Sequence, residues 1–341
     1  MSFVSYLHRA ANRENLTATD AQEAMDAVLS GEVSTTLLAS FLVAMRMKGE
    51  TPDELLGFAR AMRSKSVRVN PGLNGDPVLD TCGTGGDGLC TFNISTVAAF
   101  VIAGAGVKVA KHGNRSHSSL CGSADILEGL GVNIAISPKR MGEAIREVGI
   151  GFLYAPAIHP AMKHAQPARA ELKMRTVFNL LGPLTNPAGA TVQLVGAPSI
   201  RSAELMAQTL ASLGLQRGFV VHGLDGLDEI STTGETLALE INKGMIAHRT
   251  LTPGDFGVAR ASMDDLAGGD PATNCAIATA ILKGEPGPKR DIVMVNAAAA
   301  LMVAGKASSF IGGMDMAAAA IDSGAALGKL EALVAFTKEH K

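Results

Sequence analysis

The stretch PVLDTCGTGGDGLCTFNISTVAAFVIAGAGVKVA, residues 77–110, predicts the fold of the larger part of this chain. Residues 77–80 read as a short buried strand, and residues 83–88 form a loop that contains four glycines. Residues 95–105 have the apolar character of a buried helix, and residues 107–110 form a second strand. A strand, a glycine loop, a helix and a second strand make a βαβ unit, which predicts a mainly parallel sheet.

The same alternation recurs further along the chain. Strands are predicted at residues 193–196 and 218–222, with a helix over 202–213 between them. Two last helices are expected over residues 291–304 and 314–338. Strands and helices that alternate in this way predict an α/β fold whose central sheet is mainly parallel.

The first 70 residues show a different sequence pattern, which predicts helices only. Apolar residues recur at helical spacing over 21–29, and Ser34 can cap a second helix. The run Thr51-Pro52-Asp53-Glu54 combines a capping threonine, a proline at the first helical position and a glutamate three residues on, which is a capping box. The stretch 70–77, rich in Pro, Gly and Asn, then predicts a domain boundary.

Composition limits the classes of protein to which this chain can belong. Its 341 residues exceed the size of one usual core, and its 30 Lys and Arg nearly balance its 32 Asp and Glu. That balance argues against a protein whose main task is to hold nucleic acid or an anionic membrane. Glycine is enriched, at 38 residues, and Trp is absent. The glycine excess predicts loops built from backbone rather than a disordered or fibrous chain.

The expected compartment follows from the cysteines and the N-terminal sequence. The four cysteines form no C-x-x-C pair and have no histidine at zinc-finger spacing, so we expect free thiols in a reducing cytoplasm. The N-terminus shows no apolar signal region. The longest apolar stretch, 97–107, has 11 residues and is too short to cross a bilayer.

The glycine loop predicts a phosphate site. Residues 83–88 follow a strand and lead into Asn93-Ile94-Ser95-Thr96 at a helix start, where backbone N–H groups form an anion site. The loop also matches the dinucleotide pattern G-x-G-x-x-G, but the second strand runs into Lys111-His112, where such a site needs an acid. Asp87 inside the loop would repel a bare pyrophosphate, so we expect it to orient a ribose hydroxyl or to act with a metal.

A second loop of this kind follows the second strand. Residues 111–119 supply two cations, two imidazoles, an amide and hydroxyls, and Gly122-Ser123 precede a helix. Open α/β sheets bind ligands at the carboxyl ends of their strands. Two phosphate-binding loops on successive connections therefore predict a ligand with two separate phosphate groups.

Two further clusters complete the expected site. Asp228-Glu229 follow the strand at 218–222 and offer the carboxylate oxygens that Mg²⁺ shares with a phosphorylated substrate. Arg169 or Arg175 can take a carboxylate in a bidentate contact. The sequence has no G-x-S-x-G, H-E-x-x-H or P-loop motif. These parts suit displacement at a carbon that bears a phosphate leaving group, where positioning and charge neutralisation do most of the catalysis.

Five motifs, in this order, resemble those of the anthranilate phosphoribosyltransferase family. They are GTGGDG at 83–88, TFNIST at 91–96, KHGNR at 111–115 followed by serines, RTVFNLLGPLTNPA at 175–188 and DGLDEIS at 225–231. The resemblance covers nearly the whole chain. It implies a Mg²⁺-dependent pentosyltransferase of tryptophan biosynthesis, in which the amine of anthranilate attacks C1 of the ribose of phosphoribosyl pyrophosphate (PRPP) and pyrophosphate leaves.

The resemblance also implies a domain organisation. A small N-terminal α-helical domain would comprise residues 1–73 and a returning segment near 165–185 that carries hinge positions. A larger α/β domain that binds PRPP would comprise residues 74–164 and 186–341, with the substrate site in the cleft. Members of the family usually form homodimers through the helical domain, so a homodimer is expected.

Carried over position by position, the resemblance implies three groups of site residues. The residues implied to bind PRPP are Gly83, Gly86, Asp87, Thr91, Asn93, Ile94, Ser95, Thr96, Lys111, His112, Gly113, Asn114, Arg115, Ser116, His117, Ser118, Ser119 and Ser123. Those implied to bind anthranilate are Gly83, Asn114 and Arg169, with Arg169 facing the carboxylate. Those implied to hold Mg²⁺ are Ser95, Asp228 and Glu229. No residue is assigned as a general base.

Two pairs of residues depart from the family pattern, and three alternative functions share some of these features. Leu120-Cys121 stand where a cation and a small polar residue are expected, and Leu89-Cys90 fill a variable pair. A pyrimidine nucleoside phosphorylase would share the architecture but needs no acid pair for Mg²⁺. A non-catalytic relative that binds nucleic acid would show a basic groove and eroded acids. A dinucleotide-dependent oxidoreductase is disfavoured because Lys111-His112 stand where such a site needs an acid and because Asp87 would repel a bare pyrophosphate.

Overall fold

The βαβ unit predicted around the glycine loop is present. The computed structural model of the chain describes residues 2–73, 75–85, 88–116 and 120–339. β1 (Val78–Gly83) leads through α5 (Ile94–Gly104) to β2 (Lys108–Gly113). β1 and β2 pair in parallel, so the prediction of strand, loop, helix and parallel strand is confirmed.

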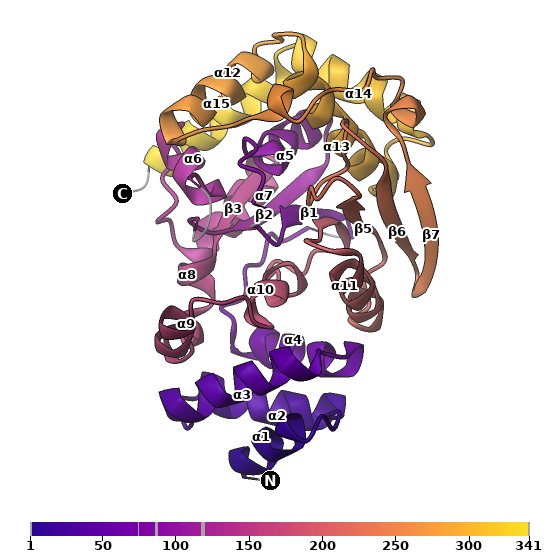
Figure 1. The fold of residues 1–341 in the computed structure, drawn as a ribbon. Coiled ribbons are helices and arrows are strands. Elements are labelled where there is room, and N and C mark those ends of the chain that lie inside the picture. Colours follow the sequence, from indigo (N-terminus) through magenta and orange to yellow (C-terminus); the bar gives the residue numbers. More distant parts are fainter. Residues whose placement is uncertain (1, 74, 86–87, 117–119, 340–341) are drawn as a thin grey trace.

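Seven strands form one sheet, in the order β3-β2-β1-β4-β5-β6-β7 (Figure 1). The remaining strands are β3 (Ile150–Tyr154), β4 (Val192–Gly196), β5 (Arg217–Gly223), β6 (Thr236–Asn242) and β7 (Met245–Leu251). The pairs from β3 to β5 are parallel, and β6 and β7 add antiparallel strands at one edge. The mainly parallel sheet is therefore confirmed, whereas β3 and the β6–β7 hairpin are not among the predicted strands.

The order of the strands reverses at β1. From β1 the chain builds outward to β2 and β3, and it then returns to add β4 and β5 on the other side of β1. In the β1–β4 pair, Gly83 lies opposite Gly196 at the carboxyl end of both strands. Open α/β sheets bind ligands in the crevice beyond the strand ends at such a reversal. The topology therefore predicts a site above Gly83 and Gly196.

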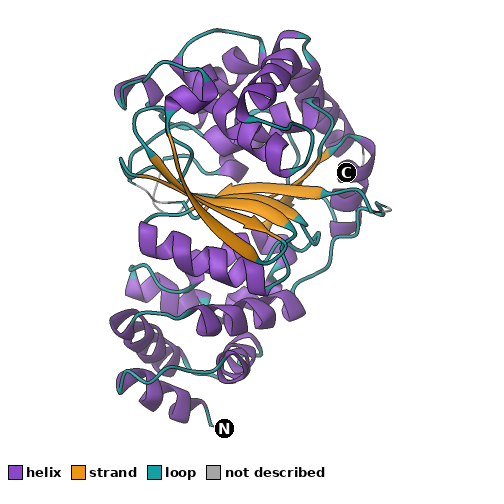
Figure 2. Ribbon diagram, turned by 90° about the vertical axis from the view of Figure 1, so that its right-hand side faces the viewer, coloured by secondary structure: helices purple, strands orange, loops and turns teal. Residues whose placement is uncertain are grey.

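Helices cover both faces of the sheet (Figure 2). The upper layer in Figure 1 contains α5 and the C-terminal helices, whose buried apolar side chains form one core cluster with that face of the sheet. Residues 97–103 of α5 are all buried, which explains why this stretch carries no polar face. The other helices of this part are α6 (Ser123–Gly129), α7 (Pro138–Glu147), α12 (Pro271–Leu282), α13 (Pro288–Val303), α14 (Phe310–Asp322) and α15 (Ala325–Lys338). Two short 3₁₀ turns, η3 (Pro253–Phe256) and η4 (Asp264–Leu266), link β7 to α12.

The opposite face of the sheet is covered by α11 (Ile200–Ser212), and the N-terminal helices pack beyond it (Figure 1). These are α1 (Phe3–Ala11), α2 (Ala18–Leu29), α3 (Thr35–Lys48) and α4 (Pro52–Lys65). A second core cluster runs from this bundle through α11 to the sheet. Ser34 caps α3 and Thr51 caps α4 in a capping box with Glu54, as the sequence predicts.

A segment after β3 connects the bundle to the sheet. It comprises α8 (Ala155–Ile158), η1 (Pro160–His164), α9 (Gln166–Leu172), α10 (Phe178–Leu181) and η2 (Gly182–Leu184), and we call it the return segment. Nε of Arg63 in α4 donates to the carbonyl of Leu184 at 2.7 Å. Just beyond, Nδ2 of Asn186 donates to the buried carboxylate of Asp80 in β1 at 2.8 Å. Burial raises the pKa of Asp80 above its ordinary value. The end of the return segment is thus bonded to both the bundle and the sheet.

One predicted helix is wrong in its extent. The stretch 314–338 is not a single helix, because the chain breaks between α14 and α15 at Ser323-Gly324. Gly324 has φ +77°, a left-handed conformation that an α-helix cannot contain and that glycine adopts without strain. No helix among the described residues combines the length and the apolar character that a bilayer crossing requires. All four cysteines are free, as expected.

Candidate active site

Two glycines at the ends of neighbouring strands make room for an acidic turn. A Cβ atom on Gly83 would lie 2.5 Å from Oδ2 of Asp228. A Cβ atom on Gly196 would lie 1.6 Å from the backbone oxygen of Asp228. Any side chain at either position would displace the turn that follows β5, so the glycines allow Asp228 to lie directly over the crevice between β1 and β4.

The two acids of this turn accept hydrogen bonds from backbone amides of the glycine loop and of α5. Oδ2 of Asp228 accepts from the N–H of Gly85 at 3.0 Å, and Oε1 of Glu229 accepts from the N–H of Ser95 at 3.2 Å. Ser95 lies in the first turn of α5, so Glu229 meets the positive end of that helix dipole. The acid pair therefore lies beside the two elements that were predicted to bind phosphate.

The acidic turn is also held from behind by α13. Asn296 is fully buried, and its Oδ1 accepts from the N–H of Ile230 at 2.9 Å. Its Nδ2 donates to the carbonyl of Ile230 at 3.0 Å and to that of Ile292 at 2.9 Å. Because Ile230 directly follows Glu229, this side-chain amide fixes the backbone that carries the acids.

The predicted loop 111–119, which we call the basic loop, begins later than expected, because Lys111 and His112 belong to β2. Lys111 lies beneath the same crevice. Its Nζ donates to the carbonyl of Thr81 at 2.7 Å and to Oγ of Ser95 at 3.3 Å. Burial lowers the pKa of the Lys111 ammonium, and the nearby Asp80 and Glu229 act in the opposite direction. Lys111 thus joins β1 to α5 and brings a positive charge close to the acid pair.

The exposed cation of the basic loop is bonded to α6. Nη1 of Arg115 forms ion pairs with Asp125 at 2.9 Å and with Glu128 at 2.5 Å. Oδ1 of Asn114 accepts from the N–H of Arg115 at 2.8 Å. The guanidinium that the sequence assigns to phosphate is therefore paired with two acids of the next helix in this structure.

The two ends of the basic loop pack against each other. A Cβ atom on Gly113 would lie 2.2 Å from Oγ of Ser123. The N–H groups of Ser116 and Gly122 both donate to Oδ2 of Asp125, at 3.1 and 2.9 Å. Among the candidate ligands, those that lie outside the described residues are Gly86, Asp87, His117, Ser118 and Ser119.

The start of α5 is tied to the basic loop. Nδ2 of Asn93 donates to the carbonyl of Cys121 at 3.0 Å, so its amide joins the loop after β1 to the loop after β2. Leu120, the departure from the expected cation, is 68% exposed and provides no charge at this position. Two candidate ligands here have almost wholly buried side chains and backbone N–H groups that bond within the same turn: Ile94 and Thr96.

A pair of buried histidines lies between the end of β2 and the return segment. Nδ1 of His112 donates to the carbonyl of Gly182 at 3.1 Å, and the ring centroids of His112 and His159 are 5.2 Å apart. Burial lowers the pKa of His112 to about 3 and that of His159 to about 4, so both rings are neutral near pH 7. Since Nδ1 of His112 carries the hydrogen, its Nε2 is a hydrogen-bond acceptor.

The two candidate arginines lie in different places. Arg169 in α9 is half-buried, with Cζ 5.4 Å from the ring centroid of Phe178, and burial lowers the pKa of its guanidinium. Arg175 is exposed, and its Nη2 donates to the carbonyl of Gly85 at 2.9 Å. The structure thus separates two arginines that were interchangeable in the sequence: Arg169 lies beside an aromatic ring, and Arg175 contacts the glycine loop.

Several buried polar side-chain atoms around the crevice have no protein partner. Within the described ranges they include Oγ1 of Thr84, Nε2 of His112, Nε2 of His159 and Oγ1 of Thr176. Buried polar groups in proteins are normally hydrogen-bonded. These unsatisfied polar atoms therefore gather at the ends of β1 and β2 and on the return segment.

The acid pair fits Mg²⁺ as a shared rather than a fully protein-bound ion. Asp228 and Glu229 bring carboxylate oxygens to one turn, and Oγ of Ser95 belongs to the residue whose N–H binds Glu229. In the described part of the chain, no group of three or more His, Cys, Asp or Glu side chains gathers at a possible metal site. Mg²⁺ commonly takes one or two carboxylates and completes its shell with water and substrate phosphates, so this donor set is suitable.

Three residues at the site were missed by reasoning from sequence: His159, Thr176 and Asn296. Thr176 and Asn296 stand inside motifs that were noticed for other reasons. His159 follows α8, which comes directly after β3, a strand that was not predicted, so the sequence offered no signal for His159. For Asn296, the available signal was its position as a lone amide in the middle of an apolar helix.

Comparison with known proteins agrees with this geometry. Residues 4–66 match the family described as "Glycosyl transferase family, helical bundle domain", and residues 75–327 match "Glycosyl transferase family, a/b domain". An anthranilate phosphoribosyltransferase from Solibacter usitatus is 62% identical over 98% of this chain and 99% of its own length.

Solved structures agree as well. The anthranilate phosphoribosyltransferase of Thermus thermophilus superposes with a TM-score of 0.92 at 46% identity, covering 98% of this chain and 99% of that one. The enzyme of Saccharomyces cerevisiae in complex with PRPP and Mg superposes with a TM-score of 0.91 at 29% identity, covering 99% of this chain and 98% of that one. On its sequence, its fold and the arrangement of its acids and glycines, the chain belongs to the anthranilate phosphoribosyltransferase family.

Proposed function

We propose that this chain transfers the phosphoribosyl group of PRPP to the amine of anthranilate, giving N-(5-phosphoribosyl)anthranilate and pyrophosphate in tryptophan biosynthesis. The observation that carries the proposal is the position of Asp228 and Glu229. These acids lie over the paired glycines Gly83 and Gly196 and are bonded to the glycine loop and to the start of α5. An acid pair between two phosphate-binding elements suits a substrate whose leaving group is a pyrophosphate carried by Mg²⁺.

Mg²⁺ is the cofactor of this reaction. Asp228, Glu229 and Ser95 would hold it, and when bound it neutralises charge that develops on the departing pyrophosphate. The contribution of the chain itself is to hold the two carboxylates in place through the N–H groups of Gly85 and Ser95. These amides already bond to the carboxylates in the structure, so the acids are positioned before the substrate and metal bind.

The PRPP side of the site is formed by the ends of β1 and β2. The glycine loop from Gly83, with Gly86 and Asp87, binds pyrophosphate and ribose, and the turn 91–96 continues this surface. Lys111 supplies a buried positive charge beneath it, which supports the assignment. The other residues assigned to PRPP belong to the basic loop and its end: His112, Gly113, Asn114, Arg115, Ser116, His117, Ser118, Ser119 and Ser123.

The anthranilate side of the site is formed by Arg169, Asn114 and Gly83. Arg169 faces the carboxylate, and its place beside Phe178 supports this role because the ring shields the guanidinium from water and strengthens an ion pair. We assign no residue as a general base.

Domain organisation and assembly are part of the same proposal. Residues 1–73 with 165–185 form the helical domain, and residues 74–164 with 186–341 form the α/β domain. The substrates meet in the cleft between them. The chain forms a homodimer through the helical domain and acts in the cytoplasm; its four free thiols are consistent with a reducing compartment.

A fluorescence assay tests the proposal. Purified protein with PRPP and Mg²⁺ is expected to consume anthranilate, and EDTA is expected to stop consumption until Mg²⁺ is restored. Parallel reactions with thymidine plus phosphate, and with NADH, test for phosphorolysis and hydride transfer. Consumption of thymidine alone would replace the transferase by a phosphorylase, and undiminished anthranilate consumption in EDTA would remove the metal from the reaction.

A further inference from the structure

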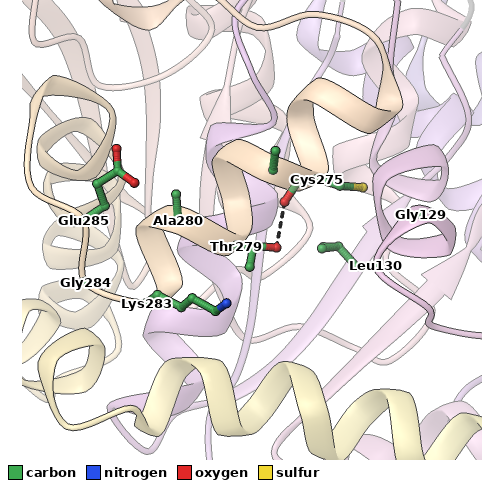
Figure 3. Close-up of a pocket in the computed structure, with 9 residues that line it drawn as sticks. Gly129, Leu130, Cys275, Thr279, Ala280, Lys283, Gly284 and Glu285 are labelled. Atoms are coloured by element: carbon green, nitrogen blue, oxygen red, sulfur yellow. Dashed lines mark hydrogen bonds between the residues drawn. The ribbon is translucent and has the colours of Figure 1, made fainter.

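Asn274, which is 1% exposed, lies in the first turn of α12 and faces the start of α5. Another face of the same helix, from Cys275 to Lys283, lines an open groove with Leu130, where the Thr279 hydroxyl bonds back to its own helix (Figure 3). Two faces of α12 therefore have different surroundings. Asn274 belongs to the side near the proposed PRPP loops, whereas Thr279 belongs to the groove.

The side chain of Asn274 is one member of a chain of hydrogen bonds. Its Oδ1 accepts from the N–H of Gly269 at 2.8 Å, and its Nδ2 donates to Oδ1 of Asn93 at 3.0 Å. Nδ2 of Asn93 in turn donates to the carbonyl of Cys121 at 3.0 Å. We call Gly269, Asn274, Asn93 and Cys121 the amide relay.

The two ends of the amide relay fix the orientation of both side chains. A backbone N–H at Gly269 can only donate, so the oxygen of Asn274 must face it and its nitrogen must face Asn93. The oxygen of Asn93 then faces Asn274, and its nitrogen faces the carbonyl of Cys121. If either side-chain amide were rotated by 180°, two donors or two acceptors would face each other. Asn274 thus determines which way Asn93 points.

The segment before α12 is also bonded to the end of the glycine loop. The N–H of Gly268 donates to the carbonyl of Cys90 at 2.9 Å, and Ala267 forms an antiparallel bridge with Thr91. A Cβ atom on Gly268 would lie 2.5 Å from the nitrogen of Phe92, so this contact requires a glycine. The amide relay therefore joins three parts of the fold: the segment 267–270, the start of α5 and the end of the basic loop.

From this geometry we infer that Asn274 is a positioning residue for PRPP. It acts through Asn93, and through a hydrogen bond of its own to the Cys121 thiol, by holding the start of α5 and Cys121 in one fixed arrangement, so that the two phosphate-binding loops present their donors together. The inference rests on the proposed function, in which both loops bind PRPP. Asn274 contacts neither the acid pair nor Arg169 in the hydrogen bonds described above, so its effect is confined to PRPP rather than shared with anthranilate.

The test is the isosteric variant Asn274→Asp. A carboxylate at this position can still accept from Gly269, but it cannot donate to Oδ1 of Asn93, so the relay is broken with little change in volume. The KM for PRPP is expected to rise by about tenfold or more, while the KM for anthranilate stays within about twofold. A KM for PRPP equal to that of the unaltered protein, in a variant with unchanged thermal stability, would overturn the inference.

Two controls separate positioning from general loss of structure. Thr279→Ala alters the same helix on the groove side, and Asn133→Asp alters an amide whose Oδ1 accepts from Ala135 and whose Nδ2 donates to Thr337. Both are expected to leave the two KM values unchanged. In the background of Asn93→Ala, Asn274→Asp is expected to add little further effect; a full additional tenfold rise would show that Asn274 does not act through Asn93.

A measurement on the unaltered chain covers the case in which Asn274→Asp does not fold. PRPP without anthranilate is expected to slow hydrogen exchange at the amide of Gly269, because binding stabilises the relay. Exchange that is unchanged by saturating PRPP would overturn the inference. The unaltered protein distinguishes failure of this inference from failure of the proposed function. If the proposed function were wrong, the unaltered protein would neither bind PRPP nor consume anthranilate.

Discussion

The two sides of the proposed site are held in contrasting ways. On the PRPP side, the polar groups bind one another: Asp228 accepts from Gly85, Glu229 accepts from Ser95, and Lys111 donates to Ser95. Near the return segment, where we propose the anthranilate side, buried polar atoms of His159 and Thr176 have no protein partner, and the glycine loop has one such atom, Oγ1 of Thr84. The first side is held mostly by contacts within the protein, whereas the second has more buried polar atoms that the protein leaves unbonded.

This difference corresponds to the chemistry of the two substrates. PRPP carries many negative charges, and fixed amides and a metal-binding acid pair must be positioned before it arrives. An aromatic acceptor brings a flat apolar ring with one carboxylate and one amine, so a buried surface with a cation and a few unpaired polar atoms recognises it. The contrast predicts that substitutions on the first side affect turnover and PRPP, and that substitutions on the second side affect the acceptor or stability.

The largest effect is expected from the acid pair. Asp228→Asn and Glu229→Gln keep the volume of each side chain but remove the charge that Mg²⁺ requires, so kcat/KM is expected to fall by about 10³-fold or more. Steady-state kinetics over a range of Mg²⁺ concentrations, with circular dichroism to confirm folding, measures this. A folded variant with more than a tenth of normal activity would remove the acids from the metal site.

A neighbouring acid provides the matched control. The carboxylate of Asp225 accepts from the hydroxyls of Ser231 and Thr233 inside its own loop and does not reach across to β1 or α5 in these contacts. Asp225→Asn is therefore expected to lower stability by about 1–2 kcal/mol with less than about threefold change in kcat/KM at saturating Mg²⁺. An equal collapse of activity would show that any change in the loop, rather than loss of the two metal acids, is responsible.

The second largest effect is expected from Arg169. Arg169→Ala removes a partly buried cation, so the KM for anthranilate is expected to rise by about 100-fold while the KM for PRPP changes by less than about threefold. Arg169→Lys is expected to restore only part of the affinity, because an ammonium cannot form the bidentate contact. Equal rises in both KM values would break the division of the site into two sides.

The histidine pair predicts a pH dependence of stability. Burial lowers the pKa of His112 and His159 from 6.5 to about 3 and about 4, so the unfolded chain binds more protons than the folded chain between those values. Their contribution to stability is fully present above pH 6.5 and is lost as the pH falls toward 4 and 3. At pH 5 the loss is expected to be about 2 kcal/mol for each histidine.

Thermal unfolding between pH 4 and pH 8 measures this effect. The unfolding temperature of the unaltered chain is expected to fall steeply below about pH 6.5. His112→Asn and His159→Asn are expected to flatten that slope, because the substituted side chain does not titrate. Comparing the slopes, rather than single unfolding temperatures, cancels the contribution of titratable groups that all three proteins share. Parallel slopes would mean that the histidines are not held neutral in the folded protein.

Local signals were sufficient to predict much of the fold. The capping box at Thr51, the cap at Ser34 and the βαβ unit depend on neighbouring residues, and each is present. The break at Gly324 was missed because the apolar pattern of 314–338 continues through it, although a glycine inside a helical pattern was a visible warning. The β6–β7 hairpin was missed because its exposed strand, β7, carries little apolar pattern.

Prediction from the sequence was more limited for the site than for the fold. The types of residue that bind phosphate and metal could be predicted, because glycine loops and acid pairs are recognisable in one short stretch. Which groups meet did not follow from local patterns: Glu229 bonds to Ser95, 134 residues away, and only the family resemblance had placed these two residues together, at the metal. Arg115 illustrates the converse, since its predicted phosphate role competes with Asp125 and Glu128, acids that follow it in the sequence.

The smallest effect is expected from Arg175, whose bond to the carbonyl of Gly85 joins the return segment to the PRPP side. The side chain is exposed and its acceptor is an uncharged carbonyl, so Arg175→Ala is expected to raise the KM for PRPP by only about threefold. Glu171→Ala, an exposed change in the same segment, controls for general effects and is expected to alter neither KM. If Arg175→Ala instead raised the KM for PRPP by 100-fold, the return segment would have to count as part of the PRPP side. The two sides would then be one cooperative surface, in which ordering of the glycine loop depends on the segment that carries Arg169.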